Sequence, residues 1–245
     1  MILTVLVGNT NTRLAWFNSR RLERFLILPT PALRDGRLPR PGPIAGIAVA
    51  SVVAAVTNPV IERLRSSTGL EPLVVGPGTR TGLRFKYLRK DLGADRVCVA
   101  VGAARSLPGR DVIVFDFGTA TTVNVILGEG VFAGGAILPG IQMSLDCLAA
   151  GTAGLPIVTP GRLLGPLQRT TRTAIQAGVS ALFAGGIDRI VDQVELGLRR
   201  RFEVVATGGA ASIARSYGRR IRSVRPRLAN EGLGEIWYRN NCPRE

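Results

Sequence analysis

The feature that most constrains the fold of this chain is a pattern that occurs twice. Residues 2–22, ILTVLVGNTNTRLAWFNSRRL, and residues 111–135, DVIVFDFGTATTVNVILGEGVFAGG, each contain an apolar strand, a glycine turn rich in hydroxyl groups, an alternating strand and a third short strand. Two unrelated hairpins would explain either stretch alone, but two copies at matching offsets predict two similar domains, 1–109 and 110–245. Aligning the copies matches four pairs of residues: Gly8 with Gly118, Asn9 with Thr119, Thr12 with Thr122, and Leu6 with Asp116.

A duplicated unit of this kind is similar to the architecture of the acetate and sugar kinase, Hsp70 and actin superfamily. These α/β proteins have two ribonuclease-H-like domains with a nucleotide in the cleft between them. The residues suit such a site, because glycine allows a tight turn with outward backbone N–H groups and Thr or Asn adds donors for phosphate oxygens. We therefore expect two ribonuclease-H-like domains with an interdomain nucleotide cleft.

The charge of the chain is unusual and leaves two alternatives open. The 245 residues carry a formal net charge of +15, and Lys86 and Lys90 are the only lysines among the basic residues. An arginine-rich composition would give a solvated basic surface, whereas a functional surface would bind polyanions. Aromatic residues make up only 5% of the chain and no helix-turn-helix or zinc motif is present, so we expect no nucleic acid partner.

The residue types that are missing or scattered limit the chemistry and the compartment. The chain has no histidine, which excludes Ser-His-Asp and His-metal mechanisms. Cys98, Cys147 and Cys242 show no CxxC spacing, which argues against a disulfide framework or a zinc site. The first residues lack a secretory pattern, and the longest apolar run, residues 44–56, is too short to span a bilayer. We expect a cytoplasmic protein without a membrane partner.

Periodicity and turn residues give a coarse map of the elements. Helices are expected over 58–66 with Thr57 or Asn58 as the cap, over 93–105, from 139 towards 149, and over 171–198 with a break near Gly185 and Gly186. Strands are expected over 47–53 and 73–75 and at 137–138. A strand, a Gly-Gly turn and a helix are expected within 201–218.

Ten separate motifs, in order along the chain, carry a resemblance to one family. They are GNTNT at 8–12, ASVV at 50–53, GLRFKY at 82–87, LGADR at 92–96, DFGTATT at 116–122, GGAILPG at 134–140, LP at 155–156, RTTRTAIQAG at 169–178, ATGGAA at 206–211 and ANEGLGEIW at 229–237. Over nearly its whole length the chain resembles type III pantothenate kinase, also called the Bvg accessory factor family. DFGTATT is the most specific of these motifs.

The resemblance implies an activity and its cofactors. The family transfers the ATP γ-phosphoryl group to the hydroxyl of pantothenate, giving 4′-phosphopantothenate in the first step towards coenzyme A. The resemblance also implies Mg²⁺, a monovalent cation such as K⁺ or NH₄⁺, and a homodimer whose pantothenate site lies near the subunit interface.

The resemblance assigns roles in substrate binding and catalysis to five residues, three of them in the LGADR motif. Asp95 would be the catalytic base, a carboxylate that the helix N-terminus keeps ionised. Arg96 would hold the pantothenate carboxylate with its planar fork of donors, and Gly93 belongs to the same substrate-binding motif. Tyr87 would contact pantothenate, and Thr171 would reach it from the partner subunit. Structural alternatives stay open: a favourable first-turn Asp, a solvated Arg, a packed strand Tyr and a helix-capping Thr.

Other matching residues concern the nucleotide and its cation. Asp116 resembles the residue associated with the cation near the phosphates, with an Asp that caps its own turn as the alternative. A Gly-Gly turn brings backbone close to a ligand and aims a helix N-terminus at it, although a plain strand-to-helix connection would look the same. The residues expected to bind the nucleotide are Gly8, Asn9, Thr10, Gly118, Thr119, Thr121, Gly208 and Gly209.

Two stretches depart from the family pattern. The family writes its first turn Asp-x-Gly-Asn-Thr, but this chain has Leu6 in place of the acid that holds the Mg²⁺–ATP complex, and residues 1–22 contain no other carboxylate. YLRKD, residues 87–91, lacks the family's Asn-Pro or Asp-Pro, is one residue shorter and has Arg89 and Lys90 there. Loss of the acid predicts weaker transition-state charge stabilisation.

Three hypotheses follow from the departures. The first is a pantothenate kinase, either fully active or weakened. The second is a degenerate kinase homologue that binds nucleotide or pantothenate and acts as a regulator or scaffold. The third is a nucleic-acid-binding regulator that uses the basic surface.

Overall fold

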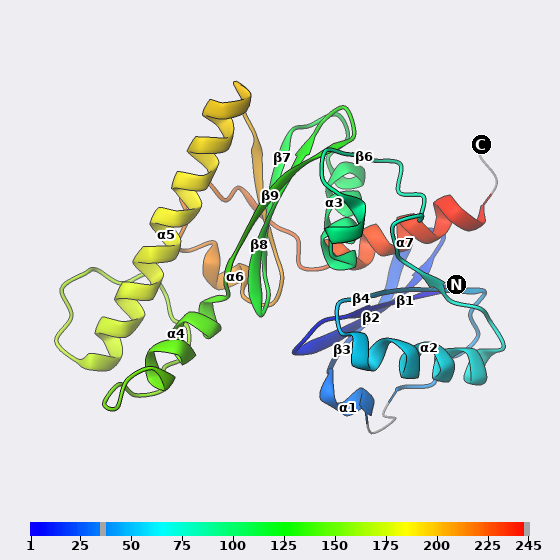
Figure 1. Ribbon diagram of the computed structural model, residues 1–245, viewed down its shortest axis with the longest axis horizontal. Coiled ribbons are helices and arrows are strands. Elements are labelled where there is room, and N and C mark those ends of the chain that lie inside the picture. The colour runs from blue at the N-terminus through cyan, green and yellow to red at the C-terminus, as the bar shows by residue number, and fades with distance from the viewer. Residues whose placement is uncertain (35–37, 243–245) are drawn as a thin grey trace. The chain divides into compact units, whose positions relative to one another are not determined.

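The computed structural model describes residues 1–34 and 38–242, which form two compact units (Figure 1). Unit 1 consists of residues 1–108, 130–133 and the C-terminal segment from residue 227. Unit 2 consists of residues 109–129 and 134–226. The first crossing between the units lies next to the expected boundary at 109 and 110, whereas the C-terminal segment belongs to unit 1 and not with the residues that precede it.

Unit 1 is built on a five-stranded sheet with the order β3-β2-β1-β4-β5. β1, β2 and β3 are antiparallel neighbours, whereas β1 with β4 and β4 with β5 are parallel. All six residues of β1 are buried, as expected for an apolar central strand covered on both faces. The strands are β1 Ile2–Val7, β2 Asn11–Asn18, β3 Arg21–Pro29, β4 Gly46–Ser51 and β5 Leu73–Val74.

Alternation of side chains along the strands sends residues of this sheet into two cores. On one face the strands pack against α1 (Pro31–Arg34) and α2 (Ala54–Thr68), whose Leu64 is fully buried. On the other face β2 packs against α7 (Leu228–Asn241) through Trp237. The sheet of unit 1 therefore has helices on both sides (Figure 1).

Helix α3 (Ala94–Ser106) packs closely against α7 because glycines allow the two backbones to approach. A Cβ added at Gly232 of α7 would lie 1.9 Å from the carbonyl oxygen of Cys98, and one added at Gly102 of α3 would lie 2.2 Å from that of Leu228. This contact explains why the C-terminal segment belongs to unit 1.

A short stretch of unit 1 leads into α3. Strand β6 (Arg84–Phe85) pairs in parallel with Val131 and Phe132, the first residues of β9 (Val131–Pro139). The short 3-10 helix η1 (Arg89–Asp91) follows β6. This pairing places Phe132 next to the segment that carries the predicted substrate motif.

Unit 2 repeats the topology of unit 1. Its strands have the order β11-β10-β7-β8-β9, so both sheets place the third, second, first, fourth and fifth strands of the unit side by side. β7 is antiparallel to β8 and parallel to β10, as β1 is to β2 and β4. The prediction of a duplicated ribonuclease-H-like α/β fold is therefore confirmed. The new strands are β7 Val112–Phe117, β8 Ala120–Leu127, β10 Glu203–Thr207 and β11 Ser223–Val224.

Three helices belong to unit 2: α4 (Ile141–Ala150), α5 (Thr171–Leu198) and α6 (Ala211–Ala214). Six of the eight buried residues of α5 recur every four positions from Ile175 to Glu195, which is the pattern of a helix with one face on a core. By length and composition alone α5 could cross a membrane, but a core helix of a soluble protein passes the same test. The expected absence of a membrane partner stays a prediction.

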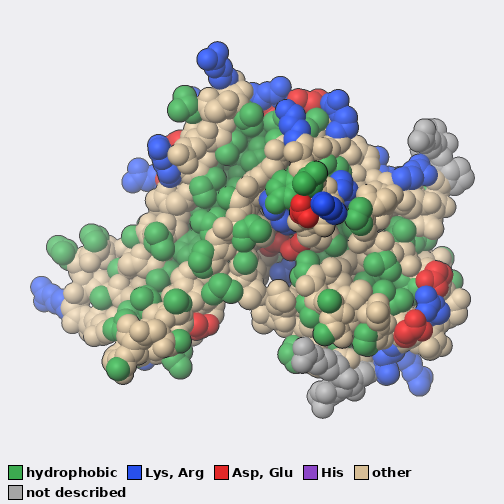
Figure 2. All heavy atoms as spheres, viewed as in Figure 1, with side chains coloured by type: hydrophobic (Ala, Val, Ile, Leu, Met, Phe, Trp, Pro, Cys, Tyr) green, Lys and Arg blue, Asp and Glu red, His purple; other side chains and the backbone are tan. Residues whose placement is uncertain are grey.

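Unit 2 also carries most of the large hydrophobic side chains that are exposed. Figure 2 shows many hydrophobic side chains on the surface of the part that contains α4 and α5. Leu167 is 94% exposed and Leu182 is 68% exposed. The set in unit 2 is Ile137, Met143, Leu148, Ile157, Leu163, Leu167, Leu182, Leu196 and Leu198.

Two predicted helices differ from the structure. The helix expected from residue 58 begins at Ala54, and Thr57 lies inside it, with its hydroxyl donating to the carbonyl oxygen of Val53 at 2.9 Å. The helix continues through Pro59 and so forgoes one backbone hydrogen bond. The expected break near residues 185–186 does not occur, because α5 is one continuous helix with Thr170 as its cap.

Candidate functional site

The turn between β1 and β2 is exposed at its tip, and its backbone is held by hydrogen bonds from Thr30. The amide of Gly8 donates to the carbonyl oxygen of Asn11 at 3.1 Å, which leaves Asn9 and Thr10 exposed at the tip. The hydroxyl of Thr30 donates to the carbonyl oxygen of Gly8 at 2.6 Å, and its amide donates to that of Thr10 at 2.9 Å. These bonds hold the backbone of the predicted phosphate turn in one conformation.

The equivalent turn between β7 and β8 has one residue fewer. The amide of Gly118 donates to the carbonyl oxygen of Ala120 at 3.2 Å, so only Thr119 lies between them. Gly140, just before α4, lies against this turn, since a Cβ added there would be 2.1 Å from the carbonyl oxygen of Thr119. The exposed Gly118 and Thr119 therefore lie close to the start of α4.

The shorter second turn changes the equivalence between the two hairpins. Thr12 pairs with Val7, and in the second hairpin Thr121 pairs with Phe117. The sequence alignment of Thr12 with Thr122 is therefore wrong by one residue. Two residues before the turn glycine, Leu6 pairs with Arg13 across the first hairpin. At the corresponding position of the second hairpin, Asp116 pairs with Thr122.

Asp95 lies in the first turn of α3. Its Oδ1 accepts a hydrogen bond from the backbone amide of Arg96 at 2.8 Å, and Gly93 leaves room for it, since a Cβ there would lie 2.5 Å from Oδ1. Burial raises the pKa of the Asp95 carboxyl, although the Arg96 amide and the charges of Arg96 and Arg13 oppose the shift. Burial thus outweighs the helix start, which we had expected to keep this group ionised.

Arg96 is buried between aromatic rings. Arg96 is only 5% exposed. Its guanidinium lies 5.5 Å from the ring centroid of Tyr87 and 5.6 Å from that of Phe132. The two rings meet edge to face at 6.1 Å. The alternative of a solvated Arg96 is therefore wrong, and two of the predicted substrate residues are in contact.

Arg89, one of the two basic residues of YLRKD, contacts the loop at residues 76 and 77. The Nη2 of Arg89 donates to the carbonyl oxygen of Gly76 at 2.8 Å, and its guanidinium lies 4.3 Å from the ring centroid of Phe85. Burial lowers the pKa of Arg89. Arg89 thus ties η1 to the loop at residues 76 and 77.

In unit 2, the Gly-Gly turn lies against the end of β7. Gly208 has φ +92°, and a Cβ added there would lie 2.4 Å from Oδ1 of Asp116 and 2.6 Å from the carbonyl oxygen of Phe117. The amide of Ala210 donates to that same carbonyl oxygen at 3.1 Å. Two oxygens therefore converge beside Gly208. The helix that follows, α6, has only four residues and gives no helix-terminus site of the kind expected.

Two other predicted residues of unit 2 are placed differently. Thr121 is 1% exposed on β8, and its hydroxyl has no hydrogen-bond partner in the part of the chain that the structure describes. Thr171 is exposed as the first residue of α5, while the cap of that helix is Thr170, whose Oγ1 accepts from the amide of Thr173 at 3.2 Å. Capping therefore does not explain Thr171.

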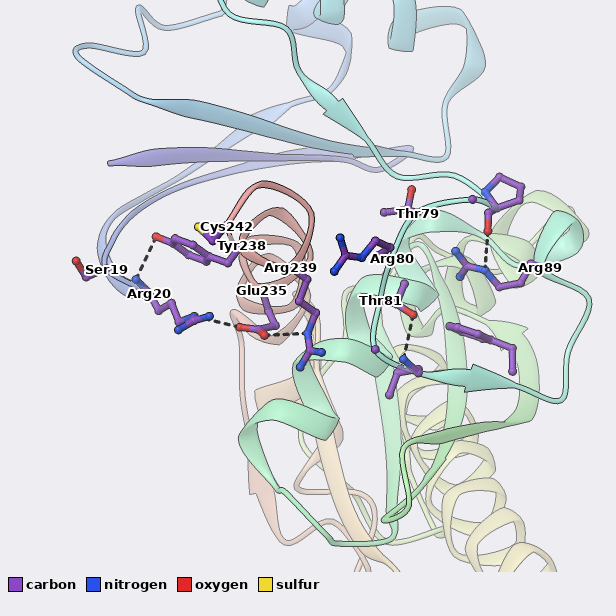
Figure 3. Close-up of a pocket in the computed structure, with 15 residues that line it drawn as sticks. Ser19, Arg20, Thr79, Arg80, Thr81, Arg89, Glu235, Tyr238, Arg239 and Cys242 are labelled. Carbon is purple, nitrogen blue, oxygen red and sulfur yellow. Dashed lines mark hydrogen bonds and ion pairs between the residues drawn. The ribbon is translucent and has the colours of Figure 1, made fainter. Parts of the chain in front are cut away.

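A cavity of about 1000 Å³ in unit 1 is lined by Arg89 and Phe85 but by none of the predicted site residues. It lies between the loop at 77–83, the β2–β3 turn and the end of α7 (Figure 3). Glu235, whose side chain is 9% exposed, pairs there with Arg239 at 2.9 Å and Arg20 at 3.5 Å, and also with Arg105 at 3.7 Å. This ion-pair cluster connects α7 with α3 and the β2–β3 turn.

Sequence reasoning missed two residues beside the predicted site. Phe132 could not be found, because nothing in the sequence shows that β6 pairs with the start of β9. Arg13 could have been found, since alternation along β2 and the hairpin turn place it opposite Leu6.

Comparison with known sequences gives consistent matches. The model of the family described as Type III pantothenate kinase matches residues 2–193. A type III pantothenate kinase from Moorella thermoacetica is 36% identical over an alignment of 259 residues, covering 98% of this chain and all of the relative. One from Anaeromyxobacter sp. is 35% identical over 254 residues with the same coverage.

Comparison with solved structures supports the fold. A Baf family transcriptional activator from Campylobacter jejuni aligns with TM-score 0.62 and 18% identity over 97% of this chain and 98% of the other. The ethanolamine utilization protein EutJ from Carboxydothermus hydrogenoformans aligns with TM-score 0.57 and 16% identity, covering 96% and 89% of the two chains. At these identities the likeness concerns the fold alone.

Proposed function

The chain belongs to the type III pantothenate kinase family, and we propose how its residues carry out that family's reaction. The reaction is the transfer of the γ-phosphoryl group of ATP to the hydroxyl of pantothenate, which yields 4′-phosphopantothenate. In this proposal the first hairpin turn and the start of α3 act in unit 1. The second hairpin turn and the Gly-Gly turn act in unit 2.

The observation that carries the proposal is the setting of Asp95. A glycine leaves space for its carboxylate, the next backbone amide orients it, and burial raises its pKa. A raised pKa makes Asp95 a stronger base than an exposed carboxylate, which suits a group that accepts the hydroxyl proton as the phosphoryl group arrives. Asp95 is therefore our candidate for the catalytic base, with Gly93 as part of its support.

Arg96 and Tyr87 are our candidates for binding pantothenate. A guanidinium held against two aromatic faces keeps its donor edge in a fixed plane, and a carboxylate can bind that edge with two parallel hydrogen bonds. Burial strengthens such a charged pair, because water screens it less. The substrate's carboxylate end would then bind at Arg96, with its hydroxyl end towards Asp95.

The nucleotide is assigned to the two turns and the Gly-Gly turn. Anchored backbone turns with exposed Asn or Thr residues can donate to phosphate oxygens without reorganising. Gly209 has open space where a Cβ would lie, so a ligand can approach the backbone closely there, and Gly208 holds the turn against the end of β7. Thr121 is the weakest member of this set, because its side chain is buried. The others in the set are Gly8, Asn9, Thr10, Gly118 and Thr119.

The chain's residues fit the two cations of the family unequally. The monovalent cation is assigned to the end of β7, where the carboxylate of Asp116 and the carbonyl oxygen of Phe117 both lie against Gly208 and would offer it oxygen ligands, and it would offset phosphate charge there. Mg²⁺ does not fit the first turn, because Leu6 is apolar and 6% exposed. Within the described residues, no group of three or more His, Cys, Asp or Glu could hold a metal ion.

A homodimer is supported by one face of α5. Thr171, Ala174, Gly178, Leu182 and Gly185 are exposed and follow each other at spacings of three or four, so they share one stripe of the helix. Small residues around one exposed leucine suit close packing against another helix. In a dimer through this stripe, Thr171 would lie at the interface and could contribute to the partner's pantothenate site. We place the reaction in the cytoplasm, with no nucleic acid or membrane partner.

The test of this proposal is direct detection of 4′-phosphopantothenate. The purified protein is incubated with ATP, Mg²⁺, K⁺ and pantothenate, with Asp95→Asn and Arg96→Gln measured beside it. We expect turnover in the natural protein, loss of kcat in Asp95→Asn and a raised KM for pantothenate in Arg96→Gln. ATP binding without any turnover would overturn the proposal in favour of a degenerate homologue.

A further inference from the structure

The two hairpins differ most in the charge of one cross-strand pair. Two positions before the turn glycine, the second hairpin pairs Asp116 with Thr122, and the first pairs Leu6 with Arg13. A carboxylate thus pairs with a hydroxyl in the second hairpin, and an apolar side chain pairs with a guanidinium in the first. Relative to the second hairpin, the first has no negative charge and one additional positive charge at this pair of positions.

The pair in the first hairpin is positioned to meet a ligand at the turn. Directly paired residues of antiparallel strands project from the same face of a sheet, so the side chains of Leu6 and Arg13 are neighbours. Gly8 follows on that face two residues later and has no side chain there. Leu6 is buried, whereas Arg13 is partly exposed. Arg13 therefore projects from the face of the sheet that packs against α7, next to the turn of the hairpin.

Arg13 also acts on the predicted catalytic carboxylate. Its charge opposes the rise in the pKa of Asp95, which means that the two groups are close enough to interact electrostatically. Among the described residues no carboxylate lies within ion-pair distance of Arg13. Its donors are thus not committed to a neighbouring acid.

We propose that Arg13 binds the phosphate chain of the nucleotide directly and supplies from the protein the positive charge that a carboxylate-held Mg²⁺ would otherwise bring to the first turn. This inference rests on the proposed function, because it assumes that the hairpin turns bind ATP. An arginine offers a planar fork of donors that matches phosphate oxygens, and its charge does not depend on a metal. Leu6 is then compatible with phosphate binding, since a carboxylate at that position would pair with Arg13 and withdraw its donors.

Measuring ATP binding in the absence of metal tests whether Arg13 binds the phosphates directly. We would measure ATP affinity by calorimetry, in EDTA and in Mg²⁺, for the natural protein, Arg13→Gln and Arg21→Gln. Arg21 is a matched control, since it begins β3 in the same sheet, opposite the far end of β2, and its side chain is 86% exposed. We expect the natural protein to bind ATP in EDTA and Arg13→Gln to lose about 10- to 100-fold in that affinity, with Arg21→Gln unchanged.

A second variant gives the first hairpin the cross-strand pair of the second hairpin. Leu6→Asp combined with Arg13→Thr reproduces in the first hairpin the pair that the second one has, Asp116 and Thr122. We expect this double variant to bind ATP weakly in EDTA and to recover affinity in Mg²⁺. Thermal unfolding checks that the fold survives an acid at a buried position.

The outcomes separate this inference from the proposed function. If the natural protein phosphorylates pantothenate but Arg13→Gln binds ATP in EDTA as tightly as the natural protein, the inference about Arg13 fails alone. If ATP binding depends on Arg13 but no 4′-phosphopantothenate forms, the inference stands and the kinase proposal fails. If the natural protein binds no ATP in either condition, both fail.

Discussion

The carboxyl Oδ1 of Asp95 accepts a hydrogen bond from the backbone amide of Arg96 at 2.8 Å, so the predicted base is oriented by the first turn of the helix in which it lies. The neighbouring Gly93 has no Cβ, and any side chain there would occupy the space of the carboxylate. Burial nevertheless raises the pKa of this group. The site therefore keeps a carboxylate in a place that favours its protonated form, which has consequences for both activity and stability.

The pH dependence of turnover should show the raised pKa of Asp95. A general base acts only when it is deprotonated, so kcat/KM for pantothenate should fall as the pH drops through the pKa of the free enzyme's carboxyl. Because burial raises that pKa, we expect the fall at a higher pH than for an exposed aspartate. Steady-state kinetics over a pH series would measure it, with circular dichroism to show that the protein stays folded. An acid limb in the ordinary aspartate range would contradict this.

Asp95→Asn should reduce activity and increase stability. Removal of a general base lowers kcat by about 10²- to 10⁴-fold. Because the pKa of Asp95 is raised in the folded state, the folded protein binds the carboxyl proton more tightly than the unfolded chain does. The ionised carboxylate therefore lowers the free energy of unfolding once the pH exceeds the unfolded-state pKa. At neutral pH the amide removes that cost, and we expect the free energy of unfolding to rise by about 0.5–2 kcal/mol. Urea denaturation at pH 7 and at pH 4 would test this, because the gain should shrink at the lower pH.

The contact between α3 and α7 should depend on one glycine much more than on its neighbour. A Cβ at Gly232 would lie 1.9 Å from the backbone oxygen of Cys98, which can move only with its helix. A Cβ at Gly234, on the same helix, would meet the ring of Phe17 at 3.5 Å, an ordinary contact. We expect Gly232→Ala to lower the free energy of unfolding by about 3 kcal/mol or more, and Gly234→Ala to change it by less than about 1 kcal/mol. Equal effects in urea denaturation would contradict this packing.

Glu235 should contribute to stability although it has no predicted role in catalysis. Its nearly buried carboxylate pairs with three arginines, and removing the charge leaves the guanidinium groups close together without it. Two of these partners are about half exposed, which limits the loss, so we expect Glu235→Gln to cost about 1–3 kcal/mol. Glu62→Gln removes an exposed pair with Arg65 and should change stability little. An equal loss in both variants would show that burial of Glu235 does not matter.

The repeated topology could be predicted because local sequence patterns indicate it. Alternating apolar residues and a turn glycine occur in both hairpins, and α5 has the expected bounds because Thr170 caps its start. The start of α2 was missed because no capping side chain marks it: Val53 stands at the cap position and Pro59 lies inside the helix.

The parts that could not be predicted depend on contacts between distant segments. The assignment of α7 to unit 1 rests on the fit of Gly232 against Cys98, and a glycine in a helix gives no sign of its partner. The environment of Arg96 depends on Phe132, which reaches it through the pairing of β6 with β9. The exact register of the second hairpin depends on a turn one residue shorter, which the alignment of Thr12 with Thr122 concealed.

The exposed stripe of α5 predicts that one substitution separates the subunits and weakens pantothenate binding while ATP binding is kept. Leu182 is 68% exposed among small residues and shares its stripe with Thr171, so a charge there would have to be buried in the proposed dimer. We expect Leu182→Glu to give a monomer in light scattering, with KM for pantothenate raised about tenfold or more, because each site loses the partner's contribution. Ile27→Glu, at a position 52% exposed on β3 of unit 1, should leave mass and KM unchanged. A Leu182→Glu protein that stays dimeric would place the interface elsewhere, and a monomeric natural protein with full activity would remove Thr171 from the site.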